Sequence, residues 1–134
     1  PLLLRHSAEY LTDEVIQTLQ EFATQMENAA DLEEFLELDR QFHFATYRAE
    51  GTYVLRDLVT RLWNTTQPYR RAYTGLVDHE HMRIFHDDHH MLVSALRDGD
   101  LELAEQVVAI HIRRTRVNLE RHPEIFPQPD PNQE

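Results

Sequence analysis

The chain has 134 residues, of which 41% are hydrophobic, and a formal net charge of −11. This length favours a single domain, and the acidic balance makes the chain by itself a poor partner for nucleic-acid phosphates. The absence of cysteine excludes disulfides and thiolate chemistry, and no apolar run reaches the roughly 18 residues that a membrane span needs. With no secretory signal at its start, we expect a cytoplasmic protein without membrane contact.

Amphipathic periodicity predicts helices along nearly the whole chain. The predicted helices span residues 2–11, 12–30, 31–50, 52–73, 79–98 and 100–122. Thr12 or Asp13, Asp31 and Asp100 are suitable N-caps, because a short polar side chain accepts hydrogen bonds from the free amides of the first turn. Gly99 favours helix termination, and the short connections favour antiparallel neighbours. We therefore expect an all-α fold, an antiparallel helical bundle of six to seven helices.

Two of these helices carry apolar stripes that we expect to face the bundle interior. In the segment 12–30 the stripe consists of Val15, Leu19, Phe22 and Met26. In the segment 52–73 it consists of Leu55, Leu58, Val59, Leu62 and Trp63. Pro68 lacks a backbone N–H, so we expect a kink there or the end of the helix.

Three helices carry polar residues on the side that should face the core. Residues four apart share one face of a helix, so Asp39 and His43 lie together on the apolar side of the third helix. His89 and His111 lie on the apolar stripes of the fifth and sixth. Burying an unpaired carboxylate is costly, and the cost is offset best if these groups meet. Three neutral imidazoles and one carboxylate suit a divalent metal ion such as zinc, nickel, iron or manganese.

Simpler interpretations stay open for each residue taken singly. His89 or His111 alone is more often a core imidazole that bonds to a carbonyl group. Asp39 and His43 can form an ordinary intrahelical pair. The coincidence on three facing stripes favours the metal site.

The sequence "HEHMRIFHDDHH" contains further histidines. His79 and His81 precede or open the fifth helix and His90 falls off its apolar stripe, so we do not expect these three to bind metal. His86 lies one turn before His89 and stays open as a ligand or a neighbour of the ligands.

No catalytic motif accompanies these residues. The chain has no cysteine nucleophile, no serine in a G-x-S-x-G turn, no H-E-x-x-H and no Gly-rich phosphate loop. We therefore do not expect an enzyme. Three histidines and a carboxylate with open positions can activate water, however, so a metal-dependent enzyme of hydrolase or lyase type is one alternative and a purely structural metal is another.

Three stretches resemble a known family: "LDRQFHFATYRAEG", "LVTRLW" and "DDHHMLVSALRDGDLELAEQVVAIHIRRTRVNL". They are similar to the FCD domain, the C-terminal effector-binding domain of the FadR subfamily of GntR-type transcription regulators, and the similarity covers roughly residues 7–120. The pattern of the family's metal-binding branch is an Asp and a His four apart, a second His before a Gly-Asp pair and a third His after it. Around Gly99 and Asp100 this pattern falls on the four predicted metal ligands.

The resemblance implies a cytoplasmic homodimer that binds a divalent metal and a small organic or sugar acid. We expect the bundle to span residues 1–122, and the Pro-rich composition without periodicity predicts a loose tail at residues 123–134. In this family a winged helix-turn-helix domain precedes the bundle and binds DNA. We expect the present chain to be a fragment without that domain and without the beginning of the first helix.

A carboxylate effector would need a cation nearby. Arg70 is our candidate, because it continues the inward stripe of Val59 and Trp63 if the helix survives Pro68. The alternative is a solvated arginine at a helix end. Asn64 and Tyr69 are further candidates for effector contacts.

Overall fold

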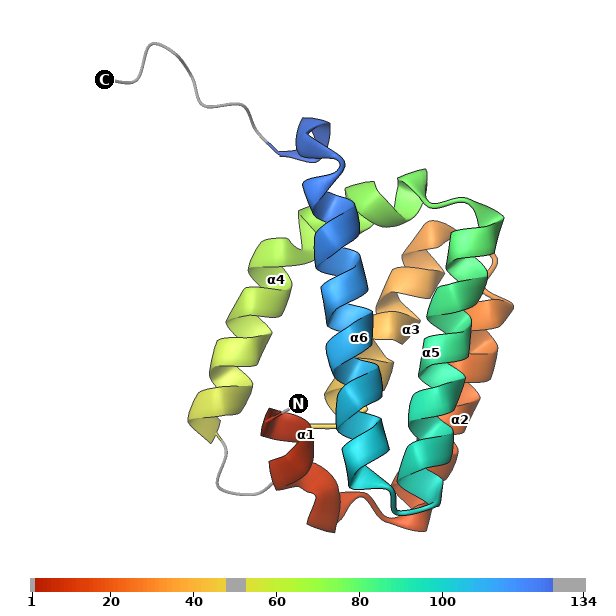
Figure 1. The fold of residues 1–134 in the computed structure, drawn as a ribbon, viewed down its shortest axis with the longest axis vertical. Coiled ribbons are helices and arrows are strands. Elements are labelled where there is room, and N and C mark those ends of the chain that lie inside the picture. Colours follow the sequence, from red (N-terminus) through yellow and green to blue (C-terminus); the bar gives the residue numbers. More distant parts are fainter. Residues whose placement is uncertain (1, 48–52, 127–134) are drawn as a thin grey trace.

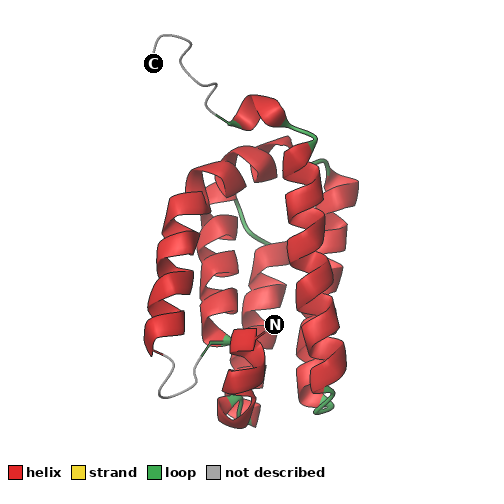
Figure 2. Ribbon diagram, turned by 60° about the vertical axis from the view of Figure 1, so that its left-hand side comes forward, coloured by secondary structure: helices red, strands yellow, loops and turns green. Residues whose placement is uncertain are grey.

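The computed structural model describes residues 2–47 and 53–126, and within them it contains six α-helices, two 3₁₀ turns and no β-strand (Figures 1 and 2). The elements are α1 Leu2–Ser7, η1 Ala8–Tyr10, α2 Asp13–Glu27, α3 Leu32–Ala45, α4 Tyr53–Leu76, α5 His79–Arg97, α6 Leu101–Glu120 and η2 Pro123–Ile125. The predicted all-α bundle is confirmed.

Four helices form the core of the bundle. α2 packs extensively against both α3 and α5, and α5 packs against α6. In Figure 1, α6 lies in front of α3 and α5 in front of α2, while α4 stands at the flank and α1 lies near the lower end. The most deeply buried large side chains come from several elements: Leu4, Leu19, Met26, Phe42 and Val93.

The helix starts follow the predicted capping chemistry. The side chains of Thr12, Asp31 and Asp100 each accept the backbone N–H three residues ahead, at 2.9–3.4 Å. Asp78 caps α5 in the same way, which the sequence reading missed. Each cap satisfies an amide that the first turn leaves without a partner, so the starts of four helices are fixed locally.

The turn between α5 and α6 depends on Gly99. Its φ is +71°, a left-handed conformation that glycine adopts at little cost. The N–H of Asp100 donates to the carbonyl of Ala95 at 2.9 Å, and the N–H of Gly99 donates to that of Leu96 at 3.2 Å. This is a Schellman motif, and it reverses the chain so that α5 and α6 lie side by side.

The predicted inward stripe of α4 is wrong at two positions. Leu58 and Leu62 are 51% and 56% exposed, whereas Val59 and Trp63 are partly buried. The side chain of Leu55 lies outside the described residues. Because α4 packs mainly against α3 at the flank of the bundle, only a narrow strip of its surface is covered.

Pro68 does not end α4. The helix continues through it to Leu76, and its second half bends across the upper end of the bundle in Figure 1. A proline inside a helix removes one backbone hydrogen bond and favours such a bend. The predicted kink therefore positions residues 69–76 differently from the first half of the helix.

Three smaller differences concern boundaries and faces. In α2 the buried residues are Ile16, Leu19, Ala23 and Met26, so the stripe is rotated from the predicted one. α3 ends at Ala45, before the predicted end, and residues 48–52 lie outside the described part. The expected loose tail begins with a 3₁₀ turn, after which Phe126 packs on the ring of Tyr69.

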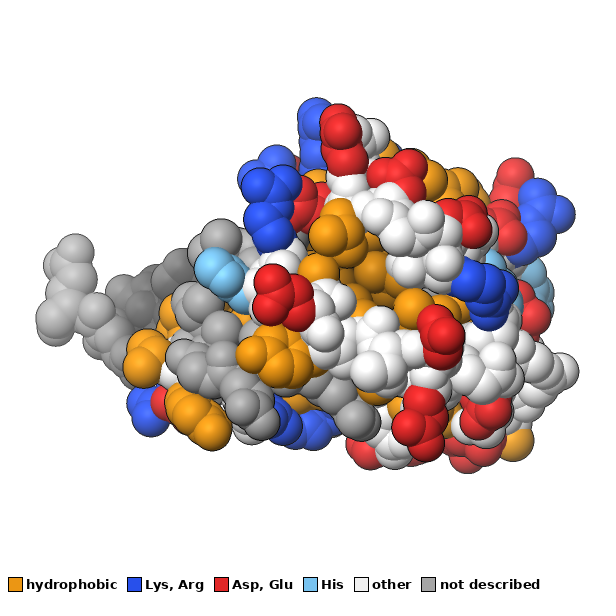
Figure 3. All heavy atoms as spheres, turned by 90° about the horizontal axis from the view of Figure 1, so that it is seen from below, with side chains coloured by type: hydrophobic (Ala, Val, Ile, Leu, Met, Phe, Trp, Pro, Cys, Tyr) orange, Lys and Arg blue, Asp and Glu red, His pale blue; other side chains and the backbone are white. Residues whose placement is uncertain are grey.

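The surface agrees with the acidic composition. Seen from below, acidic side chains are spread over the face of the molecule, and apolar side chains show between them (Figure 3). In the part of the chain that the structure describes, no helix is long and apolar enough to cross a membrane.

Candidate metal centre and adjoining cavity

α3 brings Asp39 and His43 into the bundle interior. Both lie on the face that also carries Phe35, Phe42 and Thr46, and all five residues are buried. The 3.6-residue period places them one turn apart on that face. The prediction that α3 presents a carboxylate and an imidazole to the core is therefore confirmed.

Three histidines from three helices meet at this face. One ring nitrogen each of His43, His89 and His111 lies within 4.8 Å of those of the other two. Their ring centroids are 5.0–5.4 Å apart. These three donor nitrogens lie close enough together that the group could hold one metal ion.

Asp39 lies against the same cluster. Its Oδ1 is 3.4 Å from Nε2 of His43 and 3.4 Å from Nε2 of His89. Burial would raise the pKa of Asp39, but the imidazoles, His43 first, outweigh it and lower the pKa below its ordinary value. The carboxylate is therefore ionised at neutral pH and available as an oxygen ligand.

His89 provides the test of whether the cluster fits a metal ion. It is 2% exposed, and neither of its ring nitrogens has a hydrogen-bond partner. Burial lowers its pKa well below the ordinary value, although Asp39 opposes this, so the ring is neutral. Buried polar atoms nearly always have partners. A neutral, unpartnered nitrogen beside two other imidazoles and a carboxylate fits a divalent metal ion.

The third imidazole is held by residues that the sequence reading missed. Nδ1 of His111 lies 3.1 Å from Oδ2 of Asp88, and Arg114 donates a short hydrogen bond to the same oxygen. The spacing of Asp88 in the sequence indicates a buried position, because it lies three residues after Phe85 and four before Leu92, on the inward side of α5.

Arg70 faces the cluster from α4. Its guanidinium stacks 3.9 Å over the ring of Trp63, and it donates to the Trp63 carbonyl at 2.8 Å and to Thr66 Oγ1 at 2.6 Å. Burial lowers the pKa of Arg70, while the charge of Asp39 acts in the opposite direction. Trp63 also packs on His43, with ring centroids 5.3 Å apart, so the stripe predicted for Arg70 leads to the cluster.

A cavity of about 50 Å³ joins the cluster to Arg70. It is lined by Phe35, Asp39, Arg70, Tyr73, Thr74, Phe85, His89, His111 and Thr115. Tyr73, which the sequence reading also missed, accepts a hydrogen bond from Asn118 at 2.7 Å through its hydroxyl. Asn64 is exposed, and neither Asn64 nor Tyr69 belongs to this lining; their effector contacts stay predictions that the geometry does not support.

The sequence profile of the FCD domain matches residues 1–114. The chain belongs to the FCD family. FCD domains are the effector-binding domains of GntR-type regulators and are typically regulatory rather than enzymatic. Comparison with curated proteins and with solved structures gave no match.

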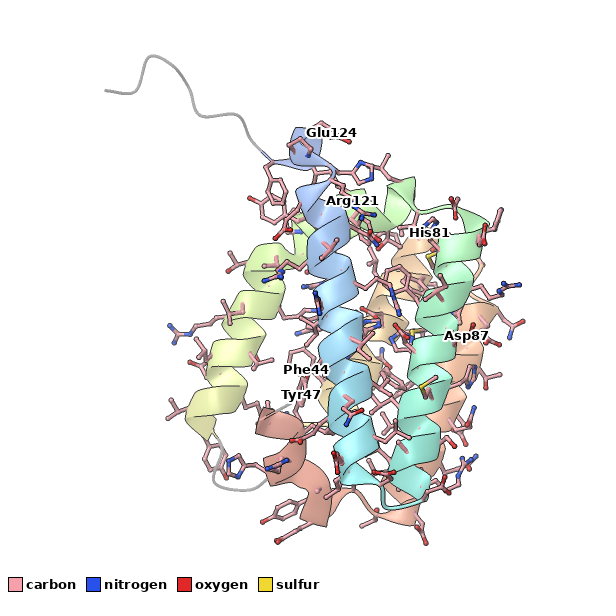
Figure 4. All side chains as sticks on the ribbon, in the orientation of Figure 1. Phe44, Tyr47, His81, Asp87, Arg121 and Glu124 are labelled. Atoms are coloured by element: carbon pink, nitrogen blue, oxygen red, sulfur yellow. The ribbon has the colours of Figure 1, made fainter. Side chains whose placement is uncertain are left out.

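Other histidines of this FCD domain have partners outside the cluster. His81, at the exposed start of α5, pairs with Asp78 at 2.8 Å (Figure 4). His90 bonds through one ring nitrogen to Gln20 at 3.1 Å and through the other to Glu27 at 2.8 Å, which ties α5 to α2. These contacts explain the two side chains without a metal.

His86 is distinct from both groups. It is not a member of the three-histidine cluster, and its ring meets the ring of Phe35 edge-on at 5.9 Å. Its Nδ1 is buried without a hydrogen-bond partner, and burial lowers its pKa. Its contribution to metal binding stays an open prediction.

The FCD domain also has a larger, open groove of about 580 Å³. Its lining comes from α2, α3 and the start of α4: Thr18, Phe22, Gln41, Phe44, Ala45 and Arg56. Phe44 lies at the end of α3 beside Tyr47 (Figure 4). This lining has one charged residue and no histidine, so we place the candidate site at the smaller cavity.

Proposed function

We propose that this FCD domain senses a small carboxylate next to a divalent metal ion held by Asp39, His43, His89 and His111. In the full regulator, a cytoplasmic homodimer, occupancy of the site would change DNA binding by a winged helix-turn-helix domain. One observation carries the proposal: a single cavity is lined both by members of the histidine cluster and by Arg70.

The charges of the lining favour an anion. Asp39 is the only acidic residue among the proposed ligands, so a bound divalent ion would keep a net positive charge and offer open positions to a carboxylate oxygen. Arg70 adds a permanent positive charge on the opposite helix. A buried carboxylate between these groups would have its charge compensated, as burial requires.

Arg70 is oriented to bind a carboxylate. A guanidinium has five N–H donors, and the two hydrogen bonds of Arg70 to Trp63 and Thr66 leave three of them. Stacking on Trp63 holds the plane of the group in place. The geometry therefore limits the number of rotamers that Arg70 loses on binding, which favours affinity.

The size of the cavity favours a short acid. Typical small-molecule sites enclose about 300–1,000 Å³, whereas this cavity has about 50 Å³ between the rings of Phe35, Tyr73 and Phe85. An acid with a few carbon atoms fits such a space better than a sugar acid. A longer acid would require α4 to move, and α4 has the least extensive packing of the long helices.

The experiment is a thermal-shift panel of hydroxy acids, dicarboxylates and sugar acids on metal-free and metal-loaded protein. We expect one short carboxylate to raise the melting temperature by several degrees in the loaded protein only. Arg70→Ala should weaken that acid about tenfold or more, since a hydrogen bond to a charged group contributes about 1.5–3 kcal/mol.

The matched control is Arg61→Ala, because Arg61 lies on the same helix but pairs only with exposed Asp57. It should respond like the wild type. If no acid has an effect while metal removal unfolds the domain, the metal is structural. Turnover of an acid would show an enzyme and contradict the proposal.

A further inference from the structure

Asp88 is a buried carboxylate, and it directly precedes the proposed ligand His89 in the chain. It lies on α5, is 8% exposed, and its side chain contacts two residues of α6. One is Nδ1 of His111 at 3.1 Å, and the other is the guanidinium of Arg114. A carboxylate in this environment requires compensating partners, because burying a charge without them is costly.

The contact fixes the tautomer of His111. An ionised carboxylate can only accept hydrogen bonds, so Nδ1 of His111 must carry the proton. With that proton on Nδ1, the lone pair of the ring lies on Nε2, which could then bind a metal ion. The same contact holds the ring plane, as carboxylates do behind metal-binding histidines.

Arg114 secures the carboxylate in turn. It lies one turn after His111 on α6 and donates to the oxygen that His111 also uses, while its own side chain reaches partial exposure of 30%. Its charge offsets the burial of Asp88. The three residues therefore form a chain, Arg114–Asp88–His111, that connects the edge of the bundle to the cluster.

The other two imidazoles have no comparable support. Nε2 of His43 and Nε2 of His89 each lie 3.4 Å from Oδ1 of Asp39, which is itself a proposed ligand, and neither ring nitrogen of His89 makes a hydrogen bond. His111 is the imidazole of the cluster whose ligand nitrogen is selected before any metal arrives.

We propose that Asp88 is a positioning residue of the metal centre, which with Arg114 presets the tautomer and orientation of His111. This inference rests on the proposed metal site. It adds a residue that does not touch the metal and yet sets the affinity for it.

The first test reads the tautomer in metal-free protein, by ¹⁵N chemical shifts of the imidazole nitrogens in uniformly labelled chain. We expect His111 of the wild type as the Nδ1–H form. Asp88→Ala should move it toward the Nε2–H form, and Asp87→Ala should not, because Asp87 has the same charge but is exposed on the same helix (Figure 4). An Nε2–H form in the wild type would overturn the proposal.

The second test measures Zn²⁺ affinity by competition with a chromophoric chelator. Asp88→Ala should bind Zn²⁺ about 10–100-fold more weakly, the usual cost of losing such a partner. Asp87→Ala should match the wild type, and His111→Ala should lose more than Asp88→Ala. Absorption of the Co²⁺-loaded forms should show an altered centre in Asp88→Ala but not in Asp87→Ala.

The outcomes separate this inference from the proposed function. If His111→Ala binds Zn²⁺ as tightly as the wild type, the metal site itself is wrong. If His111→Ala is impaired but folded Asp88→Ala is not, the positioning role alone is wrong. Should Asp88→Ala fail to fold, Asp88→Asn keeps the shape without the charge and is held to the same affinity criterion.

Discussion

The buried position of His89 keeps its imidazole in the neutral form, which is the form that can bind a metal ion. A histidine that is 2% exposed would bury a charge if it were protonated, so burial lowers its pKa and keeps the ring neutral. A neutral imidazole is also the form that binds metal. Thus the same burial that lowers the stability of the metal-free protein also keeps the His89 ring in the form that can bind a metal ion.

Stability should therefore depend on pH through His89. Below about pH 6.5 the unfolded chain binds a proton at this residue, whereas the folded chain does not until the pH reaches its lowered pKa. The free energy of unfolding of metal-free protein should fall as the pH drops through this window. Urea denaturation between pH 5 and 7.5 measures it.

His89→Leu should show a smaller slope in that window than the wild type, and His81→Gln, altered at an exposed site, should keep the wild-type slope. Asp39 does not interfere, because its lowered pKa places its loss of stabilisation at more acidic pH. Equal slopes in His89→Leu and the wild type would contradict the prediction.

For the four proposed ligands the sequence predicted the inward face, but for Asp88 and Arg114 it did not predict the contact. The helical period alone places Asp39, His43, His89 and His111 on inward sides, since it needs only local geometry. The contact of Asp88 with Arg114 depends on the rotation and register of α5 against α6. Those come from packing of the whole bundle, which a periodic pattern does not specify.

At the scale of the elements, replacing either of two glycines by alanine should have opposite effects on the free energy of unfolding. Gly99 has φ +71° with open space around it, so alanine there would meet no atom but would force an unfavourable backbone. Gly75 lies inside α4, and a methyl group there would contact Leu32 at an ordinary 3.8 Å. The first site is constrained by conformation and the second is not.

Gly99→Ala should lower the free energy of unfolding by about 1–2 kcal/mol, the cost of a left-handed residue with a side chain. Gly75→Ala should raise it by about 0.4–1 kcal/mol, because the unfolded chain loses freedom. Chemical denaturation of both variants checks the signs. A stabilised Gly99→Ala would mean that the α5–α6 turn does not need its left-handed residue.

For α4, the sequence predicts the helix but not which of its faces is buried. Its apolar residues cover more than one face, so the pattern predicts a helix but not which side is covered. Leu58 and Leu62 are exposed because the neighbours that would cover them are not beside α4 in the described chain. Local sequence features determine that the helix forms, how long it is and where it bends. Which of its residues are buried depends on the neighbours that pack against it.

For the whole molecule, the site exists only when the bundle is folded. Its three histidines come from α3, α5 and α6, and no single segment carries more than one of them. A ligand that binds the folded state alone stabilises it by mass action. Metal binding and folding of this domain should therefore be coupled.

Free Zn²⁺ at 100 times its Kd should raise the free energy of unfolding by about 2.7 kcal/mol, and a chelator should reverse the effect. His43→Ala should largely lose this stabilisation. His79→Ala, His81→Ala and His90→Ala should retain both metal content and stabilisation. Metal loss in these three but not in His43→Ala would overturn the assignment, and differential scanning calorimetry with metal analysis decides it.

The donor atoms of the cluster are nitrogen and oxygen only, in a chain without cysteine. Metal sites with thiolate ligands respond to peroxide, because the sulfur itself climbs an oxidation ladder and releases the metal. Imidazoles and a carboxylate have no such step. The proposed ligands therefore have no thiol chemistry, and metal binding at this cluster should be independent of the thiol–disulfide balance of its surroundings.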